Sequence, residues 1–298
     1  MEYSKAGKST LSVSRIGYGC MSLGENDSAN SHLLHAAIDK GINFFDTADL
    51  YQQGNNEITL GKALKEKRKN LIIATKVGNQ LKPGGNGWVW NPRKEYILEA
   101  VNNSLQRLQT DYIDLYQLHG GTIEDNTDET IDAFNILQQQ GKIRYYGISS
   151  IRPNVIRSYV HRSAISSVMI QYSLLDRRPE ESCLDLLADK NIGVLARGSL
   201  AGGLLVSKTA KAYLNYSEEM VKKAADAVRD ISNDKHSATA TALQFVLQQP
   251  AVTSAIVGIR TMEQLDEAIK AIESSPLSQE ELLLLQQAIP KNYYKEHR

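Results

Sequence analysis

The sequence predicts a single α/β domain over residues 1–298, folded as a closed barrel of eight parallel strands and eight helices, the (β/α)8 or TIM barrel. Short apolar segments alternate with segments of helical periodicity along almost the whole chain, which is typical of βαβ units. Eight such units in 298 residues suit a closed barrel. No Gly-rich dinucleotide motif opens the first unit, which disfavours the alternative of an open doubly wound sheet.

The expected elements follow one another in order. A polar opening that could form a hairpin around Gly7 and Lys8 precedes the first barrel strand. Helical spacing separates the strands, as in Ile97, Val101 and Leu105, and such helices are the connections that a parallel sheet requires. The eight strands are predicted at residues 15–19, 42–46, 71–77, 112–118, 143–149, 167–171, 192–197 and 252–257.

Three stretches interrupt this rhythm. Residues 79–92 are rich in Gly and Asn, residues 200–217 form a long connection with Gly and Lys, and residues 290–298 form a tail. We interpret the first two as long βα loops, which in a barrel lie at the C-terminal rim, where active sites are found. Trp88 and Trp90 in the first loop are candidates for an aromatic wall of the substrate site, although one of them could only hold the loop against the barrel.

Composition disfavours several classes of protein. Lys plus Arg equals Asp plus Glu at 34 each, so no net charge favours a nucleic acid or a membrane surface as partner. With 42% hydrophobic residues the chain can form a packed core. The polar opening MEYSKAGKST and the lack of a long apolar run predict a cytoplasmic protein without a membrane span. Two distant cysteines predict neither a disulfide framework nor a metal site, and polar helices favour a monomer.

Four ionisable residues fall at or just after the ends of three successive strands. Asp46, Lys76 and His119 end the second, third and fourth strands, and Tyr51 follows Asp46 by five residues. Adjacent strand ends meet on one arc of a barrel rim, so the four side chains could converge. A lysine ammonium beside a tyrosine favours the phenolate, a carboxylate holds the lysine in its charged form, and a histidine can hydrogen-bond a reacting oxygen.

Each of the four residues also has a purely structural interpretation. Asp46 could cap the next turn, Tyr51 could be an ordinary rim aromatic, and Lys76 could extend from its strand end into water. His119 alone would more often be a structural histidine. Their joint placement on neighbouring strands is what favours a catalytic site, in which the tyrosine donates a proton to an oxygen that gains negative charge.

The segment FFDTADLYQQGNNEITLGKAL, followed by IIATK and LYQLHG, resembles the signature of the aldo-keto reductases. The resemblance extends from VSRIGYGCMSLG at residues 13–24 to GIRTMEQLDEAI at 258–269. It implies that Asp46, Tyr51, Lys76 and His119 are the catalytic tetrad, with Tyr51 as general acid. It also implies NADPH, bound across the rim without a Rossmann domain, as the hydride donor for a small carbonyl substrate.

The resemblance further implies a set of cofactor contacts. Ser149, Ser150 and Gln171 match the positions that hold the nicotinamide amide, although many relatives have Asn at the position of Ser150. Residues 196–205 carry Arg197 where many relatives have a tyrosine beneath the nicotinamide, followed by Gly198, Ser199 and Leu200. We expect Arg197 either to underlie the ring or to pair with the pyrophosphate, and to favour the reduced cofactor; the alternative is a rim salt bridge.

The last strand leads into an expected anion site for the adenosine 2′-phosphate. Gly258 and Arg260 precede a helix whose N-terminus and dipole favour negative charge, and Arg260 adds a guanidinium fork. Gln264 and Glu267 match family contact positions, but Thr261 and Gln264 also fit a capping box. Ala268 replaces an adenine-contacting Asn of many relatives. These positions predict a preference for NADPH over NADH.

The sequence thus favours an NADPH-dependent reductase of aldehydes or ketones. Two other functions remain open. Some barrels of this family serve as cofactor-binding regulatory subunits with slow or no turnover, and an unrelated barrel lyase could use Lys76 as a Schiff-base amine. The physiological carbonyl compound is not predicted, because the loops and the tail determine it.

Overall fold

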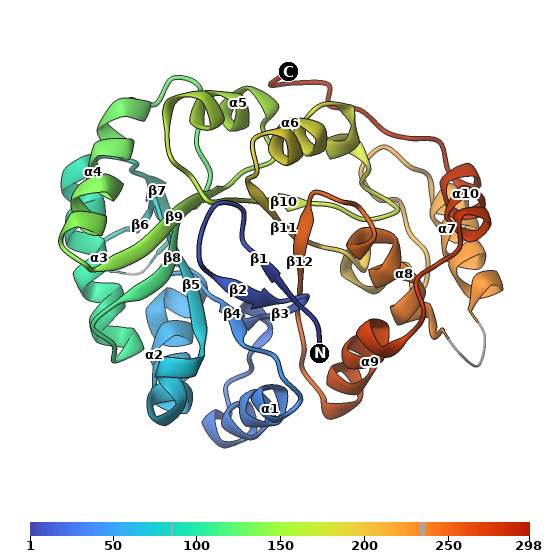
Figure 1. Ribbon diagram of the computed structural model, residues 1–298, viewed down its shortest axis with the longest axis horizontal. Helices are drawn as coiled ribbons and strands as arrows, with labels where there is room; N and C mark the ends of the chain where they lie inside the picture. The colour runs from blue at the N-terminus through green and yellow to red at the C-terminus, as the bar shows by residue number, and fades with distance from the viewer. Residues whose placement is uncertain (85, 233–235) are drawn as a thin grey trace.

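Eight parallel strands close into the expected barrel in a computed structural model that describes residues 1–84, 86–232 and 236–298. Figure 1 looks down the barrel, with helices arranged around it. Every predicted barrel strand is confirmed, with ends that differ by at most two residues from those expected. The strands are β3 (Ile16–Gly19), β4 (Phe44–Asp46), β5 (Ile72–Val77), β8 (Ile113–Leu118), β9 (Ile143–Ser149), β10 (Ser167–Gln171), β11 (Gly193–Arg197) and β12 (Val252–Val257).

The helices connect successive strands on the outside of the barrel (Figure 1). Two helices, α7 and α8, lie between β11 and β12, and α10 follows the last barrel helix α9. The α-helices are α1 (Asp27–Asp39), α2 (Asn55–Leu64), α3 (Lys94–Leu108), α4 (Thr127–Gln139), α5 (Pro153–Arg162), α6 (Cys183–Asp189), α7 (Glu218–Ile231), α8 (Ala238–Leu247), α9 (Met262–Glu273) and α10 (Gln279–Ala288). Short 3₁₀ helices are η1 (Cys20–Ser22), η2 (Tyr51–Gly54), η3 (Lys65–Asn70), η4 (Arg178–Glu181) and η5 (Ala201–Gly203).

Apolar side chains fill the two layers that a barrel requires. The inner layer, at the N-terminal end of the barrel interior, includes Phe44, Ile72, Ala74 and Leu115. The outer layer lies between the strands and the helices, where strand residues such as Ile73 pack against the apolar faces of the helices. Because successive residues of a strand point to opposite faces, residues two positions beyond the inner layer also face the barrel interior.

The expected N-terminal hairpin is confirmed and covers the N-terminal end of the barrel. Strands β1 (Tyr3–Lys5) and β2 (Ser12–Ser14) pair antiparallel around the turn at Gly7 and Lys8. Gly7 has φ of +57°, and a Cβ there would lie 2.5 Å from the Ser166 carbonyl oxygen, so both the turn and the close approach require glycine. The apolar residues of the hairpin, among them Leu11 and Val13, belong to the inner layer of the core.

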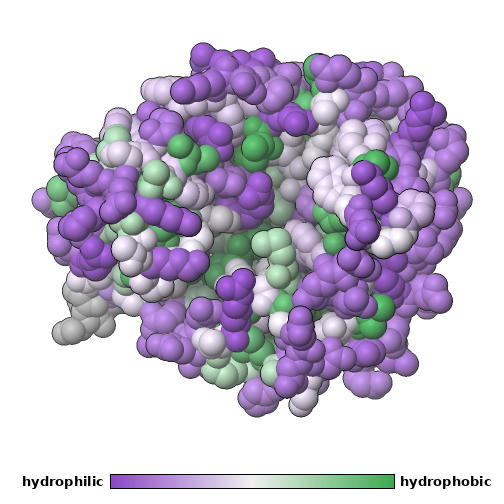
Figure 2. Space-filling view, turned by 180° about the vertical axis from the view of Figure 1, so that it is seen from behind, coloured by the Kyte–Doolittle hydropathy of each residue, from purple (hydrophilic) through white to green (hydrophobic). Residues whose placement is uncertain are grey.

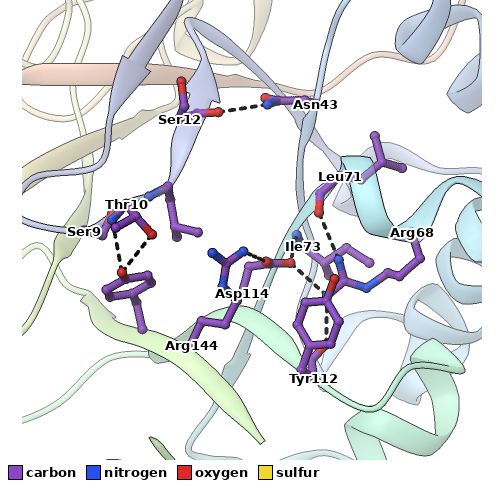
Figure 3. Close-up of polar contacts among 12 residues, drawn as sticks. Ser9, Thr10, Ser12, Asn43, Arg68, Leu71, Ile73, Tyr112, Asp114 and Arg144 are labelled. Carbon is purple, nitrogen blue, oxygen red and sulfur yellow. Dashed lines mark hydrogen bonds and ion pairs between the residues drawn. The ribbon is translucent and has the colours of Figure 1, made fainter. Parts of the chain in front are cut away.

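Buried polar contacts surround this closed end (Figure 3). The Asp114 carboxylate, which is fully buried, accepts from Arg144 at 2.8 Å, forms an ion pair with Arg68 at 2.8 Å and accepts from the backbone N–H of Ile73 at 3.0 Å. The N-terminal hairpin is also bonded to β9, because the backbone N–H of Thr10 donates to the Tyr145 hydroxyl at 3.1 Å. These contacts satisfy buried charge at the end remote from the long loops.

The two predicted long loops carry structure of their own. Within 79–92, strands β6 (Asn79–Leu81) and β7 (Trp88–Trp90) form an antiparallel hairpin. The 200–217 connection contains η5 and a bridge between Tyr213 and Tyr216. The tail lies against the loop after β10, where Asn292 accepts from the backbone N–H of Arg177 at 2.9 Å and Tyr294 is buried. Figure 2 shows the face of the molecule opposite to the N-terminal hairpin. This face is hollowed near its middle.

Candidate active site

On several neighbouring strands, the last side chains that face the barrel interior are polar. Phe44 and Ala74 belong to the inner core layer, and two residues beyond each of them stand Asp46 and Lys76. Leu115 leads by the same two-residue steps to Gln117 and His119. The pleat of the strands therefore directs these side chains to the interior of the barrel at its C-terminal end, above the apolar layer.

Asp46 and Lys76 form a buried ion pair at the centre of this end. The Lys76 ammonium donates to both carboxylate oxygens of Asp46, at 2.8 and 2.7 Å, and to the Thr47 carbonyl oxygen at 2.7 Å. Burial lowers the pKa of Lys76, but the Asp46 carboxylate and the Tyr51 hydroxyl together outweigh burial and raise that pKa above its ordinary value. Burial raises the pKa of Asp46 and Lys76 opposes it, and the two short bonds identify a charged pair. Lys76 is 0% exposed, which contradicts the alternative in which it extends into water.

Tyr51 and His119 complete the group. The Tyr51 hydroxyl oxygen lies 3.5 Å from the Lys76 ammonium nitrogen, and the Tyr51 and His119 rings meet edge to face with centroids 5.8 Å apart. Burial, together with the charges of Lys76 and Arg197, lowers the pKa of His119 to about 3. His119 is therefore a neutral imidazole at neutral pH, and its buried Nδ1 has no hydrogen-bond partner among the described residues. The structure thus brings all four predicted residues together.

Two neighbours of the ion pair were not predicted from the sequence. The carbonyl of Thr47 accepts the third hydrogen bond of Lys76, and the buried Gln117 amide donates to Asp46 at 3.4 Å. The position of Gln117 gave a usable signal, because it precedes His119 by two residues and so shares its face of the strand. A backbone carbonyl such as that of Thr47 leaves no such signal in a sequence.

The next strand ends carry Ser149, Gln171 and Arg197. Gln171 and Arg197 are register partners on β10 and β11, and Arg197 donates to the Gln171 side-chain oxygen at 2.9 Å. The Gln171 amide nitrogen donates to the Tyr213 hydroxyl at 3.0 Å, so its orientation is held from both sides. Arg197 thus contacts a neighbouring amide. Its positive charge contributes to the lowered pKa of His119 and opposes the rise that burial causes in the pKa of Asp46. Tyr213 lies in the predicted 200–217 loop, but its partner could not be foreseen.

Ser149 and Ser150 lie at the end of β9. Ser149 is half-buried and pairs in register with Met169. Ser150 is buried, and its hydroxyl oxygen accepts from the backbone N–H of Arg152 at 3.2 Å. A hydroxyl that accepts can still donate, so Ser150 retains one hydrogen-bonding function toward a ligand.

The segment after β11 turns sharply at the rim. Gly198 has φ of +70°, and a Cβ there would lie 3.3 Å from the Gln171 side chain. Ser199 is buried, and its hydroxyl has no hydrogen-bond partner among the described residues. Leu200 is half-buried and begins the turn into η5. A buried hydroxyl without a partner is the kind of group that a ligand satisfies.

The predicted anion site lies at the start of α9. Thr261 is the N-cap and its side chain accepts from the Gln264 backbone N–H. In a capping box the Gln264 side chain would accept from the backbone N–H of the N-cap residue, Thr261. Its side-chain oxygen accepts instead from the backbone N–H of Arg260, one residue earlier, at 2.8 Å. Gly258 and the Arg260 side chain are exposed, and Arg260 lines a cleft of about 330 Å³ shared with residues 21–26. Glu267 bonds Ser237 and Lys270 rather than the cleft.

The two tryptophans have different environments. Trp88 is 49% exposed, whereas Trp90 is half-buried and its indole N–H donates to the Asp125 carboxylate at 3.0 Å. The Trp90 ring lies against Gly78 and Gly120, where an added Cβ would approach it to 2.7 and 3.3 Å. Trp90 therefore fastens the β6–β7 hairpin to the strand ends that carry Lys76 and His119, and Trp88 is the aromatic left at the surface.

The described residues hold neither a membrane span nor a metal cluster. None of their helices is long and apolar enough to cross a bilayer. Within the same ranges, no group of three or more His, Cys, Asp or Glu side chains is arranged to hold a metal ion.

Comparison with known proteins agrees with this geometry. The model of the Aldo/keto reductase family matches residues 15–290. The chain is 50% identical to the uncharacterized oxidoreductase YqkF of Bacillus subtilis, over all of both chains. It is 46% identical to the holo form of the aldo-keto reductase AKR11C1 of Bacillus halodurans, with a TM-score of 0.95 over 100% of this chain and 99% of that one. The apo form of that protein gives a TM-score of 0.86 at 43% identity, over 100% and 99%. The chain therefore belongs to the aldo/keto reductase family and is an oxidoreductase built on a TIM barrel.

Proposed function

We propose that the protein reduces aldehydes or ketones to alcohols with NADPH, with Tyr51 as the proton donor. The observation that carries this proposal is the single ammonium of Lys76, which bonds the Asp46 carboxylate and lies 3.5 Å from the Tyr51 hydroxyl oxygen. A positive charge at that distance stabilises the negative charge that the tyrosine oxygen gains as it gives up its proton. The ion pair with Asp46 keeps that charge in place although the site is buried.

The residues along the rim fit a nicotinamide dinucleotide. Three features lie on the last strand ends and loops of the barrel: the Ser199 hydroxyl, which has no partner among the described residues, the Gln171 amide held by Arg197 and Tyr213, and the exposed start of α9. When bound, the cofactor supplies a hydride to the carbonyl carbon. Gln171 and Ser150 would hold the nicotinamide amide, Gly198 to Leu200 would line the pyrophosphate, and Arg260 with Gln264 would meet the 2′-phosphate.

His119 and Tyr51 would share the substrate oxygen. A neutral imidazole can donate one N–H to a carbonyl oxygen without competing with Lys76 for the charge of the carboxylate. It polarises the carbonyl while Tyr51 completes the proton transfer. Trp88, exposed on β7, would contact the remainder of the substrate, while Trp90 holds the hairpin that carries Trp88.

The experiment is a spectrophotometric assay of NADPH oxidation with an activated aromatic aldehyde. We expect turnover with the wild type and its loss in Tyr51→Phe, which keeps the ring and removes the proton. Arg260→Ala should reduce the preference for NADPH over NADH by roughly 10-fold or more, because one charge-assisted contact is lost. Turnover by Tyr51→Phe at the wild-type rate would contradict the assignment of Tyr51, and an unchanged cofactor preference in Arg260→Ala would contradict that of Arg260.

The alternatives have less support in the structure. A Schiff-base lysine must be neutral to attack a carbonyl, whereas Lys76 is held as an ammonium by Asp46. A cofactor-binding regulatory role would appear in the same assay as tight NADPH binding without turnover. The cytoplasmic location, the monomeric state, the single domain over 1–298 and the preference of Arg197 for the reduced cofactor remain predictions.

A further inference from the structure

The turn that follows Tyr51 has an unusual backbone. Gln52, Gln53 and Gly54 are three successive residues with positive φ, of 50°, 55° and 90°. Non-glycine residues disfavour this left-handed region, and two in succession are held there only by their surroundings. The direction in which Tyr51 leaves the backbone depends on this turn, because the turn follows it directly.

One buried side chain joins this turn to the end of β4. Asn56 is 0% exposed, and its amide oxygen accepts from the Thr47 hydroxyl at 2.7 Å. Its amide nitrogen donates to the Cys20 carbonyl at 2.8 Å and to the Gln52 side-chain oxygen at 3.3 Å. The oxygen and the nitrogen of this one amide thus form hydrogen bonds with three different segments of the chain.

Both ends of this network reach the proton-donating group. Thr47 is the residue whose carbonyl accepts from the Lys76 ammonium, and it follows Asp46 in the chain. Gln52 follows Tyr51, and its amide nitrogen donates to the Leu23 carbonyl at 3.2 Å. Asn56 thus lies between the residue that helps to hold Lys76 and the residue that determines the turn of Tyr51.

We infer that Asn56 is a positioning residue for proton donation: through its bonds to Thr47 and Gln52, it holds the Tyr51 hydroxyl at the distance from Lys76 that proton transfer requires. The inference rests on the proposed role of Tyr51 as proton donor. It adds a residue that touches neither the substrate nor the cofactor. Small displacements of a reacting group have large effects on rate, so the loss of this amide should slow chemistry rather than binding.

The test compares Asn56→Leu, which keeps the branched shape of the side chain and removes the amide, with Gln52→Ala, which removes one arm of the network from an exposed position. Asn55→Ala is the matched control, since Asn55 is exposed on the same helix turn. Asn56→Leu should lower kcat by roughly 10- to 100-fold while KM and the Kd for NADPH stay at their wild-type values. The solvent isotope effect on kcat should rise, because proton transfer becomes more rate-limiting. Gln52→Ala should show the same changes to a smaller extent.

A second readout does not depend on turnover. In protein labelled with a carbon isotope at tyrosine Cζ, the Tyr51 NMR signal is identified by its loss in Tyr51→Phe. That signal should shift or broaden in Asn56→Leu and in Gln52→Ala, and stay in place in Asn55→Ala. A loss of kcat in Asn56→Leu with an unchanged isotope effect and an unchanged Tyr51 signal would show a merely structural role and overturn the inference.

Two further outcomes are decisive. If Asn56→Leu does not fold, Gln52→Ala with wild-type kcat and an unchanged Tyr51 signal overturns the inference. If Tyr51→Phe turns over like the wild type, the proposed function of Tyr51 fails separately. The Tyr51 signal then still decides whether Asn56 holds this side chain, and an unchanged signal in both variants overturns that as well.

Discussion

Removing the charge of Lys76 should destabilise the fold as well as abolish activity, and removing its partner at the same time should restore much of the stability. Lys76 and Asp46 are 0% and 4% exposed, and their closest contact is 2.7 Å. At that distance and an effective dielectric constant of about 20, Coulomb's law gives about 6 kcal/mol of attraction, much of which offsets the desolvation of both groups. Breaking such a pair from one side typically costs about 3–5 kcal/mol, because the other charge is left buried.

The variants are Lys76→Met, Asp46→Asn and the double substitution. In Lys76→Met the Gln117 amide, at 3.4 Å, is the one side-chain hydrogen-bond donor left to the Asp46 carboxylate among the described residues, and we expect a loss of about 3–5 kcal/mol at neutral pH. The double variant should lose about 2–3 kcal/mol less stability than the sum of the losses in the two single variants. It should still be inactive, because Tyr51 has lost its neighbouring cation. Urea unfolding followed by tryptophan fluorescence and circular dichroism measures these differences.

The pH dependence of Lys76→Met has a definite sign. Without Lys76, burial leaves the folded-state pKa of Asp46 above its unfolded value. A group of this kind binds more protons in the folded state, so the variant should be least destabilised near about pH 4 and should lose stability as the pH rises. Additive stabilities in the double variant, or a loss in Lys76→Met that does not change with pH, would refute a charged Asp46–Lys76 pair.

Three other predictions follow from buried or crowded positions. Burial and the Glu57 carboxylate raise the pKa of Asp49 to about 7, so this group opposes folding increasingly from about pH 4 to 7. Asp49→Asn should be more stable than the wild type by about 1–3 kcal/mol at pH 8, and urea unfolding should show that this difference fades toward about pH 4. A persistent difference at low pH would contradict this titration. Asp125→Ala removes the acceptor of the Trp90 indole and of the Thr122 backbone N–H, and should cost about 1–3 kcal/mol and shift tryptophan emission, whereas unchanged emission would argue against the Trp90 clamp. Gly78→Ala should lower Tm more than Gly84→Ala, because both glycines have positive φ but only the Cβ at Gly78 meets an indole, at 2.7 Å; equal losses in calorimetry would show that backbone strain alone matters.

The barrel and the convergence of Asp46, Lys76 and His119 at one end of it could be predicted, because both depend on local regularities. Alternation of apolar strands with helical segments determined the order of the eight strands. The two-residue period of a strand then placed Asp46, Lys76 and His119 on the inward face above Phe44, Ala74 and Leu115. Side-chain direction along a strand is set by neighbouring residues in the chain, so the sequence alone carries this information.

The contacts that connect one loop to another were decided by the tertiary structure. The Trp90 indole lies against two glycines from different strand ends, Gln171 is held between Arg197 and Tyr213, and Asn56 joins β4 to the turn after Tyr51. No period in the sequence specifies such pairs, since each joins segments whose approach depends on closure of the whole barrel. The sequence by itself determined which groups could carry the chemistry, whereas only the folded chain determined which neighbours hold them in place, because a strand has one regular geometry and a loop has many.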